Sequence, residues 1–381
     1  MINYGKQWID DQDIASVLEV LKSDFLTQGP KVKAFEETLA EITGARYCVA
    51  VANGTAALHL AVAALKIPAD KNGITSAITF AASENSMLYS GLKPGFCDVD
   101  PNTICLDPED LKNTITPDTE LVIPVHFAGL AADMNSISTI ARKHNIRIIE
   151  DAAHAIGSRY HCGSRIGSCK YSDLTTFSFH PVKTVTTAEG GAITTNDEEL
   201  YNRLLLLRNH GITKNPATME QNEGPWYYEM QTLGFNYRLT DLHAALGLSQ
   251  LSKLDHFRTR RQEIVDIYNN EFETLDPVKR PVHENLPETA WHLHVIQIDF
   301  QGIGKSRAQV MAELREEGIG TQVHYIPVYR LPYYKNVISP DQPELSAAEH
   351  YYAGCLSIPL YPAMSDSDVQ KVVNSVKKVV G

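Results

Sequence analysis

Hydrophobic positions in the first two thirds of the chain alternate between helical spacing and short apolar runs. Val32, Phe35, Leu39 and Ile42 recur at three- and four-residue steps, which predicts an amphipathic helix. The apolar runs predict short buried strands at residues 47–52, 74–79, 95–99, 121–126, 147–149, 174–179 and 192–195. Because helical patterns separate several of these strands, we expect an α/β fold with a mainly parallel sheet covered on both faces.

The last part of the chain follows a different pattern. A polar stretch over residues 215–228 indicates an exposed loop, and a long helical region is predicted over 240–272. Two further helices are predicted to begin at the capping residues Ser306 and Ser365. Two more apolar runs predict strands, at residues 294–300 and 321–325. This arrangement is typical of a smaller α+β domain.

Composition narrows the class of protein. The chain has 381 residues, of which 43% are hydrophobic and 21% charged, as in soluble globular proteins. Its 46 acidic and 34 basic side chains give a net charge of −12, which argues against a general nucleic-acid binder. No apolar run approaches the roughly 18 residues of a membrane span. The six cysteines show no disulfide pattern and the first residues no signal peptide, so we expect a cytoplasmic protein that binds neither nucleic acid nor membrane.

The segment from Phe177 to Gly191 carries the strongest chemical signal. A predicted strand ends in it, and Lys183 follows among small hydroxyl residues. Ligands of α/β sheets bind at the carboxyl ends of the strands. Desolvation and nearby groups can lower the pKa of a lysine there enough to make its amine a nucleophile, as Schiff-base chemistry requires. On position alone, however, a solvated surface lysine is the more common case.

Two further segments lie at the same predicted sheet edge. Asp151 follows an apolar strand, and a carboxylate there can hold a pyridine nitrogen protonated. Alternatively, Asp151 is a helix N-cap or a loop acid. The turn Asn53-Gly54-Thr55 offers backbone N–H groups that suit a phosphate, and hydroxyls of Thr55 and Ser178 complete a phosphate cup. A phosphate cup, an acid and a lysine are together what a pyridoxal phosphate site requires.

A series of short motifs spans nearly the whole chain, at residues 26–29, 53–55, 78–80, 150–154, 177–183, 186–191, 208–211, 234–238 and 323–327. In this order they resemble the sugar aminotransferases of the DegT/StrS family, within the fold-type I enzymes that use pyridoxal 5'-phosphate. The motifs are most similar to those of the transaminases of pseudaminic acid biosynthesis. The resemblance implies a large cofactor-binding domain over residues 1–250, with segment 1–30 contributing to the substrate site, and a small C-terminal domain over 251–381.

The same resemblance implies a role for each cofactor-site residue. Lys183 would be the catalytic residue, because it would bind the cofactor covalently and later move the proton. Asp151 would pair with the pyridine nitrogen, and His154 would lie near the phenolic oxygen of the ring. Phe80 would stack on the ring, although a phenylalanine at a strand end is more often plain core. The phosphate would be held by Gly54, Thr55 and Ser178.

Partners and substrates also follow from the resemblance. Asn236 is similar to a family residue that reaches the phosphate of the neighbouring subunit's cofactor, which implies a homodimer with shared sites. From the residues alone, Asn236 is equally a turn asparagine. The amino donor would be L-glutamate, and the acceptor C4 of a UDP-linked 4-keto-6-deoxy-N-acetyl-hexosamine. Substrate contacts would come from Tyr4, Thr27, Arg238, Tyr325, Ile326, Pro327 and Val328.

Other functions stay open at this point. A 4-aminotransferase for another nucleotide 4-keto-6-deoxy sugar, such as a UDP-bacillosamine precursor or a TDP-sugar, would share the motifs. A sugar dehydratase of this family would have histidine in place of Lys183, and a non-catalytic regulator would not need Lys183 or Asp151. His292 and His294 alternate onto one face of a predicted strand. Two histidines without a third ligand favour surface residues over a metal site, so no metal is expected.

Overall fold

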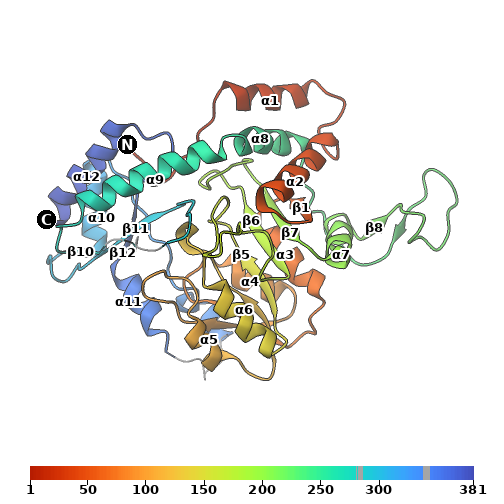
Figure 1. Ribbon diagram of the computed structural model, residues 1–381, viewed down its shortest axis with the longest axis horizontal. Helices are drawn as coiled ribbons and strands as arrows, with labels where there is room; N and C mark the ends of the chain where they lie inside the picture. The colour runs from red at the N-terminus through yellow and green to blue at the C-terminus, as the bar shows by residue number, and fades with distance from the viewer. Residues whose placement is uncertain (280, 282–285, 338–343) are drawn as a thin grey trace.

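A seven-stranded sheet forms the centre of the computed structural model, which describes residues 1–279, 281, 286–337 and 344–381 (Figure 1). Its strands are β1 (Tyr47–Val51), β2 (Asn72–Ser76), β3 (Lys93–Cys97), β4 (Thr119–Ile123), β5 (Arg147–Asp151), β6 (Leu174–Ser178) and β7 (Gly191–Thr195). They lie in the order β1-β7-β6-β5-β4-β2-β3. Only β7 runs antiparallel to its neighbours, so the expected mainly parallel sheet is confirmed.

Helices cover both faces of this sheet because successive strand residues point to opposite sides. They are α2 (Pro30–Thr43), α3 (Gly54–Leu65), α4 (Ala82–Tyr89), α5 (Pro108–Thr114), α6 (Met134–Lys143), α7 (Glu198–Arg208) and α8 (Asp241–Leu251). The first helix, α1 (Asp11–Leu21), packs on α8. Val49 and Ile149 pack with α3, α4 and α7 on one face. Cys48 and Ile148 pack with α2, α5, α6 and α8 on the other.

A second, three-stranded antiparallel sheet forms towards the C-terminus, in the order β10-β11-β12. The elements there are α9 (Leu254–Glu271), β10 (Val278–Lys279), β11 (His294–Ile298), α10 (Arg307–Glu316), α11 (Ser346–Gly354), β12 (Cys355–Ile358) and α12 (Asp366–Val380). Capping boxes at Ser306 and Ser365 begin α10 and α12, as the sequence predicts. The α/β fold with a smaller α+β part is thus confirmed.

The secondary structure departs from the sequence analysis in several places. The helical region 240–272 consists of two helices, α8 and the following α9, which are separated by a break at residues 252–253. The sequence does not predict this break, because it is too short to interrupt the apolar repeat. The predicted strand 321–325 is wrong: Gln322 forms one bridge with Ser357, and the chain then turns so that Tyr325 lines a cavity. The short strand β12 was not predicted, because its four residues carry too little pattern.

The polar stretch 215–228 is confirmed as a largely exposed loop. It joins β8 (Ile212–Thr213) to β9 (Glu229–Met230), and this hairpin extends away from the body of the molecule (Figure 1). Within the described residues, no helix is long and apolar enough to cross a lipid bilayer.

Close packing of α8 on α2 gives a first prediction. A Cβ atom on Gly247 of α8 would lie 2.5 Å from Cε2 of Phe35 and 2.7 Å from Cγ2 of Thr187. Alanine is favoured over glycine in a helix by about 1 kcal/mol, but overpacking a core costs about 1–3 kcal/mol. We expect Gly247→Ala to lower the free energy of unfolding, measured by urea denaturation. A stabilised variant would contradict this packing.

Candidate active site

A cavity of about 690 Å³ lies at the carboxyl ends of the parallel strands. It is lined by residues from the large sheet, from the first residues of the chain and from the segment before β12. The predicted site residues among its lining are Tyr4, Gly54, Thr55, Phe80, Asp151, His154, Ser178, Lys183, Tyr325, Ile326 and Val328. The fold therefore brings together residues that are more than 300 positions apart in sequence.

Lys183 projects into this cavity from the turn that follows β6. Its backbone N–H donates to the carbonyl of His180 at 2.8 Å, which closes the turn. Burial lowers the pKa of the Lys183 amine to about 8, and the nearby Asp151 carboxylate partly opposes this effect. A buried ammonium is disfavoured because it loses hydration. The structure thus provides a lysine whose amine is a nucleophile near neutral pH.

Asp151 is the last residue of β5, and its carboxylate is held by two donors. The hydroxyl of Ser83 donates to Oδ2 at 2.8 Å, and the backbone N–H of Ala153 donates to Oδ1 at 3.1 Å. The Ser83 hydroxyl also lies 2.8 Å from the hydroxyl of Thr79, with which it forms a hydrogen bond. Sequence analysis missed Ser83, because its only signal is its position one turn after Phe80 in the 78–80 motif.

The N-terminus of α3 also lines the cavity. Asn53 caps this helix by accepting from the N–H of Ala56 at 2.8 Å. The N–H groups of Gly54 and Thr55 have no partner within the helix, as in any first turn. A Cβ atom on Gly54 would lie 2.8 Å from Cβ of Ser178, so only glycine leaves this corner open. The corner matches a phosphate in charge and donor geometry.

His154 and Tyr325 form a hydrogen-bonded pair on the cavity wall. Nδ1 of His154 accepts from the backbone N–H of Ala128 at 3.3 Å, so its proton is on Nε2. Nε2 lies 3.0 Å from the Tyr325 hydroxyl and donates to it. Burial, followed by the charge of Lys183, lowers the pKa of His154 well below its ordinary value. His154 is therefore a neutral histidine with a defined tautomer.

The prediction that His292 and His294 are surface residues is wrong. Both are buried, and the His292 ring centroid lies 4.5 Å from that of His154. Burial is the main cause that lowers the pKa of His292 well below its ordinary value. Sequence analysis missed His292 as a cavity residue because strand alternation does not tell an inner face from an outer one. No cluster of three metal-binding side chains occurs in the part of the chain that is described.

Four predicted site residues do not line the cavity. Thr27 forms a bridge with Thr240 at the start of α8. Asn236 pairs with Asn209, and the Arg238 guanidinium donates to Oδ1 of Asn209 at 2.7 Å. The fourth is Pro327, which is buried beside the lining residues Ile326 and Val328.

Comparison with known proteins supports one family for the whole chain. The profile of the DegT/DnrJ/EryC1/StrS aminotransferase family matches residues 7–377. The spore coat polysaccharide biosynthesis protein SpsC of Bacillus subtilis is 40% identical over 378 residues, which are 99% of this chain and 96% of SpsC.

Two solved structures show the same fold over their full length. Helicobacter pylori PseC, an aminotransferase of pseudaminic acid biosynthesis, is 30% identical, with a TM-score of 0.92 covering 100% of this chain and 99% of PseC. The putative sugar aminotransferase Spr1654 of Streptococcus pneumoniae, in its PMP form, is 31% identical, with a TM-score of 0.91 and coverage of 100% and 99%. A structure of Spr1654 in its PLP form is similar to the same degree.

The cavity fits the expected cofactor on its own chemistry. A nucleophilic lysine, a buried carboxylate and an open helix N-terminus are the groups that covalent attachment, the pyridine nitrogen and the phosphate require. The predicted enzyme class and cofactor, a sugar aminotransferase that uses pyridoxal 5'-phosphate, are confirmed. The chain belongs to the DegT/DnrJ/EryC1/StrS aminotransferase family.

Proposed function

We propose that this protein transfers the amino group of L-glutamate to C4 of a UDP-linked 4-keto-6-deoxy-N-acetyl-hexosamine, in the pathway to pseudaminic acid. The full-length similarity to PseC supports this choice of sugar. The observation that carries the chemistry is the convergence of Lys183, Asp151 and the α3 N-terminus on one cavity. We place the reaction in the cytoplasm, because all six cysteines are free thiols.

The residues around the reacting centre divide the work of amino transfer. When bound, pyridoxal phosphate supplies an electron sink that stabilises negative charge beside the amino group. Lys183 would hold the cofactor through its neutral amine and would then move the proton between the cofactor and the substrate carbon that bears the amino group. Asp151, fixed by Ser83, keeps a proton on the pyridine nitrogen. His154 would lie near the phenolic oxygen, and Phe80, whose side chain is exposed to the cavity, would cover the ring.

In this proposal the phosphate and the sugar contact different walls of the cavity. Gly54, Thr55 and Ser178 hold the phosphate at the start of α3. The sugar nucleotide contacts the walls that come from the first 30 residues and from residues 325–328. Tyr4 is held next to residues 325–328. Its carbonyl accepts from the N–H of Leu360, and its ring lies 5.2 Å from that of His324. Thr27 belongs to the same N-terminal segment.

Charge supports a homodimer with shared sites. Among the described residues that line the cavity, Lys183 is the only lysine or arginine, yet the cofactor and a UDP-sugar are both anionic. We propose that a second copy supplies Asn236 and Arg238, which lie outside this cavity and are held in place by Asn209. The extended hairpin carries exposed apolar side chains suited to such a contact, at Trp226, Tyr228, Met230 and Leu233.

One alternative keeps the chemistry and changes the sugar. The same residues would serve a 4-aminotransferase for a UDP-bacillosamine precursor or for a TDP-sugar. A dehydratase is disfavoured because Lys183 is present. A regulator without catalysis is disfavoured by the nucleophilic pKa of that lysine and by the intact Asp151.

The lowered pKa of Lys183 predicts how its reactivity depends on pH. Only the neutral amine reacts, so acetylation of Lys183 in the cofactor-free protein should rise tenfold per pH unit and level off above about pH 8. Mass spectrometry of the peptide that contains Lys183 measures this, with Nα-acetyl-lysine, whose pKa is ordinary, as the reference. Asp151→Asn should move the midpoint to lower pH, because it removes a charge that raises the Lys183 pKa. A wild-type midpoint near the ordinary value of 10.5 contradicts the burial of this amine.

A panel of keto-sugars tests the substrate. The protein is loaded with pyridoxamine phosphate and offered UDP- and TDP-linked 4-keto-6-deoxy sugars, and the visible absorbance of the Lys183-bound cofactor is recorded. We expect the UDP-linked N-acetyl-hexosamine to restore this absorbance. Restoration by a TDP-sugar alone would overturn the proposed sugar. Lys183→Ala is the control: it should fold and yet show no transamination, since no other lysine lines the cavity among the described residues.

Mixed dimers test the shared site. We expect Lys183→Ala and Asn236→Ala homodimers each to be impaired, and their mixture, after dissociation and reassociation, to regain activity. The reason is that a shared site needs Lys183 from one chain and Asn236 from the other, and the mixed dimer contains one such intact pair. If both residues acted within one chain, mixing would restore nothing, and the proposal of shared sites would be wrong.

A further inference from the structure

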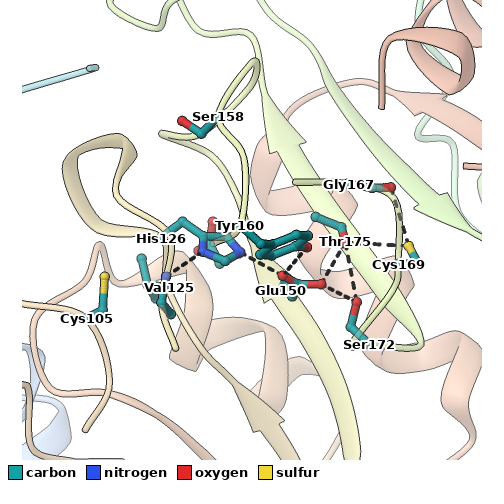
Figure 2. Close-up of polar contacts among 12 residues, drawn as sticks. Cys105, Val125, His126, Glu150, Ser158, Tyr160, Gly167, Cys169, Ser172 and Thr175 are labelled. Atoms are coloured by element: carbon teal, nitrogen blue, oxygen red, sulfur yellow. Dashed lines mark hydrogen bonds and ion pairs between the residues drawn. The ribbon is translucent and has the colours of Figure 1, made fainter. Parts of the chain in front are cut away.

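A buried polar cluster lies behind the cavity, centred on Glu150 (Figure 2). Glu150 precedes Asp151 on β5, and the two side chains point to opposite faces of the sheet because strand residues alternate. The Glu150 side chain is completely buried. Burying a carboxylate costs free energy unless hydrogen-bond donors surround it. The groups that surround Glu150 therefore need an explanation.

Four groups donate to this carboxylate. Nε2 of His126 lies 2.8 Å and the Tyr160 hydroxyl 2.7 Å from Oε2. The hydroxyls of Ser172 and Thr175 donate to Oε1, the latter at 3.3 Å. Figure 2 shows His126 and Ser172 on opposite sides of the carboxylate. Burial, and then the Glu150 charge, raise the pKa of Tyr160 well above its ordinary value, so the phenol stays a donor. Four donors match an ionised carboxylate, which only accepts.

The hydrogen bonds of His126 fix its tautomer. Its Nδ1 accepts from the backbone N–H of Ala132 at 3.1 Å, so the ring proton lies on Nε2 and points at Glu150. The backbone of His126 is bound to the same strand, because its N–H donates to the carbonyl of Asp151 at 3.0 Å. His126 thus connects β5 to the loop that follows β4.

That loop continues as a strap, defined here as residues 127–129. Ala128 and Gly129 have left-handed backbones, with φ of 55° and 104°. The strap is held at its far end by the Ser158 hydroxyl, which donates to the Gly129 carbonyl at 2.7 Å. Ala128 then donates its N–H to Nδ1 of His154. The tautomer of His154 therefore depends on where the strap lies.

We propose that the Glu150–His126 pair is a positioning device for the reaction: it fixes strap 127–129, and the strap keeps the proton of His154 on Nε2, directed at Tyr325. Because the Tyr325 oxygen accepts from His154, its hydroxyl keeps its own proton for a partner inside the cavity. Glu150 and His126 touch neither cofactor nor substrate in this proposal. The inference rests on the proposed function, since it concerns the wall that the cofactor and the sugar would contact.

The test compares three variants of the cofactor-free protein. His126→Phe removes both side-chain hydrogen bonds of His126. We expect faster amide hydrogen exchange in the peptide that contains residues 126–130, and ¹⁵N NMR of labelled histidines should show that His154 no longer holds a single tautomer. Ser172→Ala is the matched control, because it removes a donor from the same carboxylate without touching the strap. It should leave both measurements unchanged.

Glu150→Gln separates hydrogen bonding from charge. The glutamine oxygen can still accept from His126 while its amide donates to Ser172 and Thr175, so exchange and tautomer should match the wild type. In the loaded enzyme, His126→Phe should lower kcat on the order of 100-fold with little change in KM, as small misplacements of reacting groups do. Glu150→Gln should stay within a few-fold of the wild type.

Three outcomes would overturn the proposal. They are an unchanged His154 tautomer in His126→Phe, an effect of Ser172→Ala on the strap as large as that of His126→Phe, and a loss in Glu150→Gln equal to that in His126→Phe. If His126→Phe fails to fold, His126→Leu replaces it, since leucine likewise offers neither an acceptor for Ala132 nor a donor for Glu150. Exchange and tautomer are read without sugar or cofactor, so failure of the proposed substrate does not alter them.

Discussion

The parallel strands end together at one edge of the sheet, and the whole site depends on this constraint. Asp151 closes β5 and Ser178 closes β6, while the turn after β1 begins α3 with Gly54. Strand ends expose backbone and side-chain groups that the ladder does not use, so polar residues there are available for a ligand. The antiparallel β7 begins at the same edge, and it leaves room for the turn that carries Lys183.

Binding of anionic ligands by a chain with a net charge of −12 must rest on local features. The α3 N-terminus offers partial positive charge without a cationic side chain. The lowered pKa of Lys183 shows that burial outweighs the attraction of Asp151. An amine whose pKa is about 8 is half neutral at pH 8, which serves covalent attachment but leaves only part of a positive charge to hold a diphosphate. Binding of the proposed substrate therefore requires cationic and amide groups that come from outside the cavity.

Most of the central sheet could be predicted from the sequence, because its strands are short apolar runs that end in polar motifs. Asp151, Ser178 and Gly54, the candidate cofactor residues at those strand ends, followed from the same patterns, whereas the proposed roles of Phe80 and His154 came from the family resemblance. What could not be predicted are contacts between distant segments, such as the Ser83–Asp151 and His154–Tyr325 hydrogen bonds. Residues 321–325 have a strand-like composition. In the fold, however, only Gln322 forms a bridge, and residues 322–325 line the cavity. The burial of His292 likewise depends on its contacts with Ala128 and His154, which are distant in the sequence.

Ala128 shows why this wall tolerates little change. Its N–H donates to His154, which follows β5 of the large sheet, while its carbonyl accepts from the N–H of His292 at 2.9 Å. The buried Arg261 guanidinium donates to the carbonyls of His292 and Leu360, which ties α9 to the same segment. A left-handed backbone costs a non-glycine residue about 1–2 kcal/mol, and hydrogen bonds on both sides of the peptide offset that cost. One strained residue thus joins the two parts of the chain where the cofactor's ring would lie.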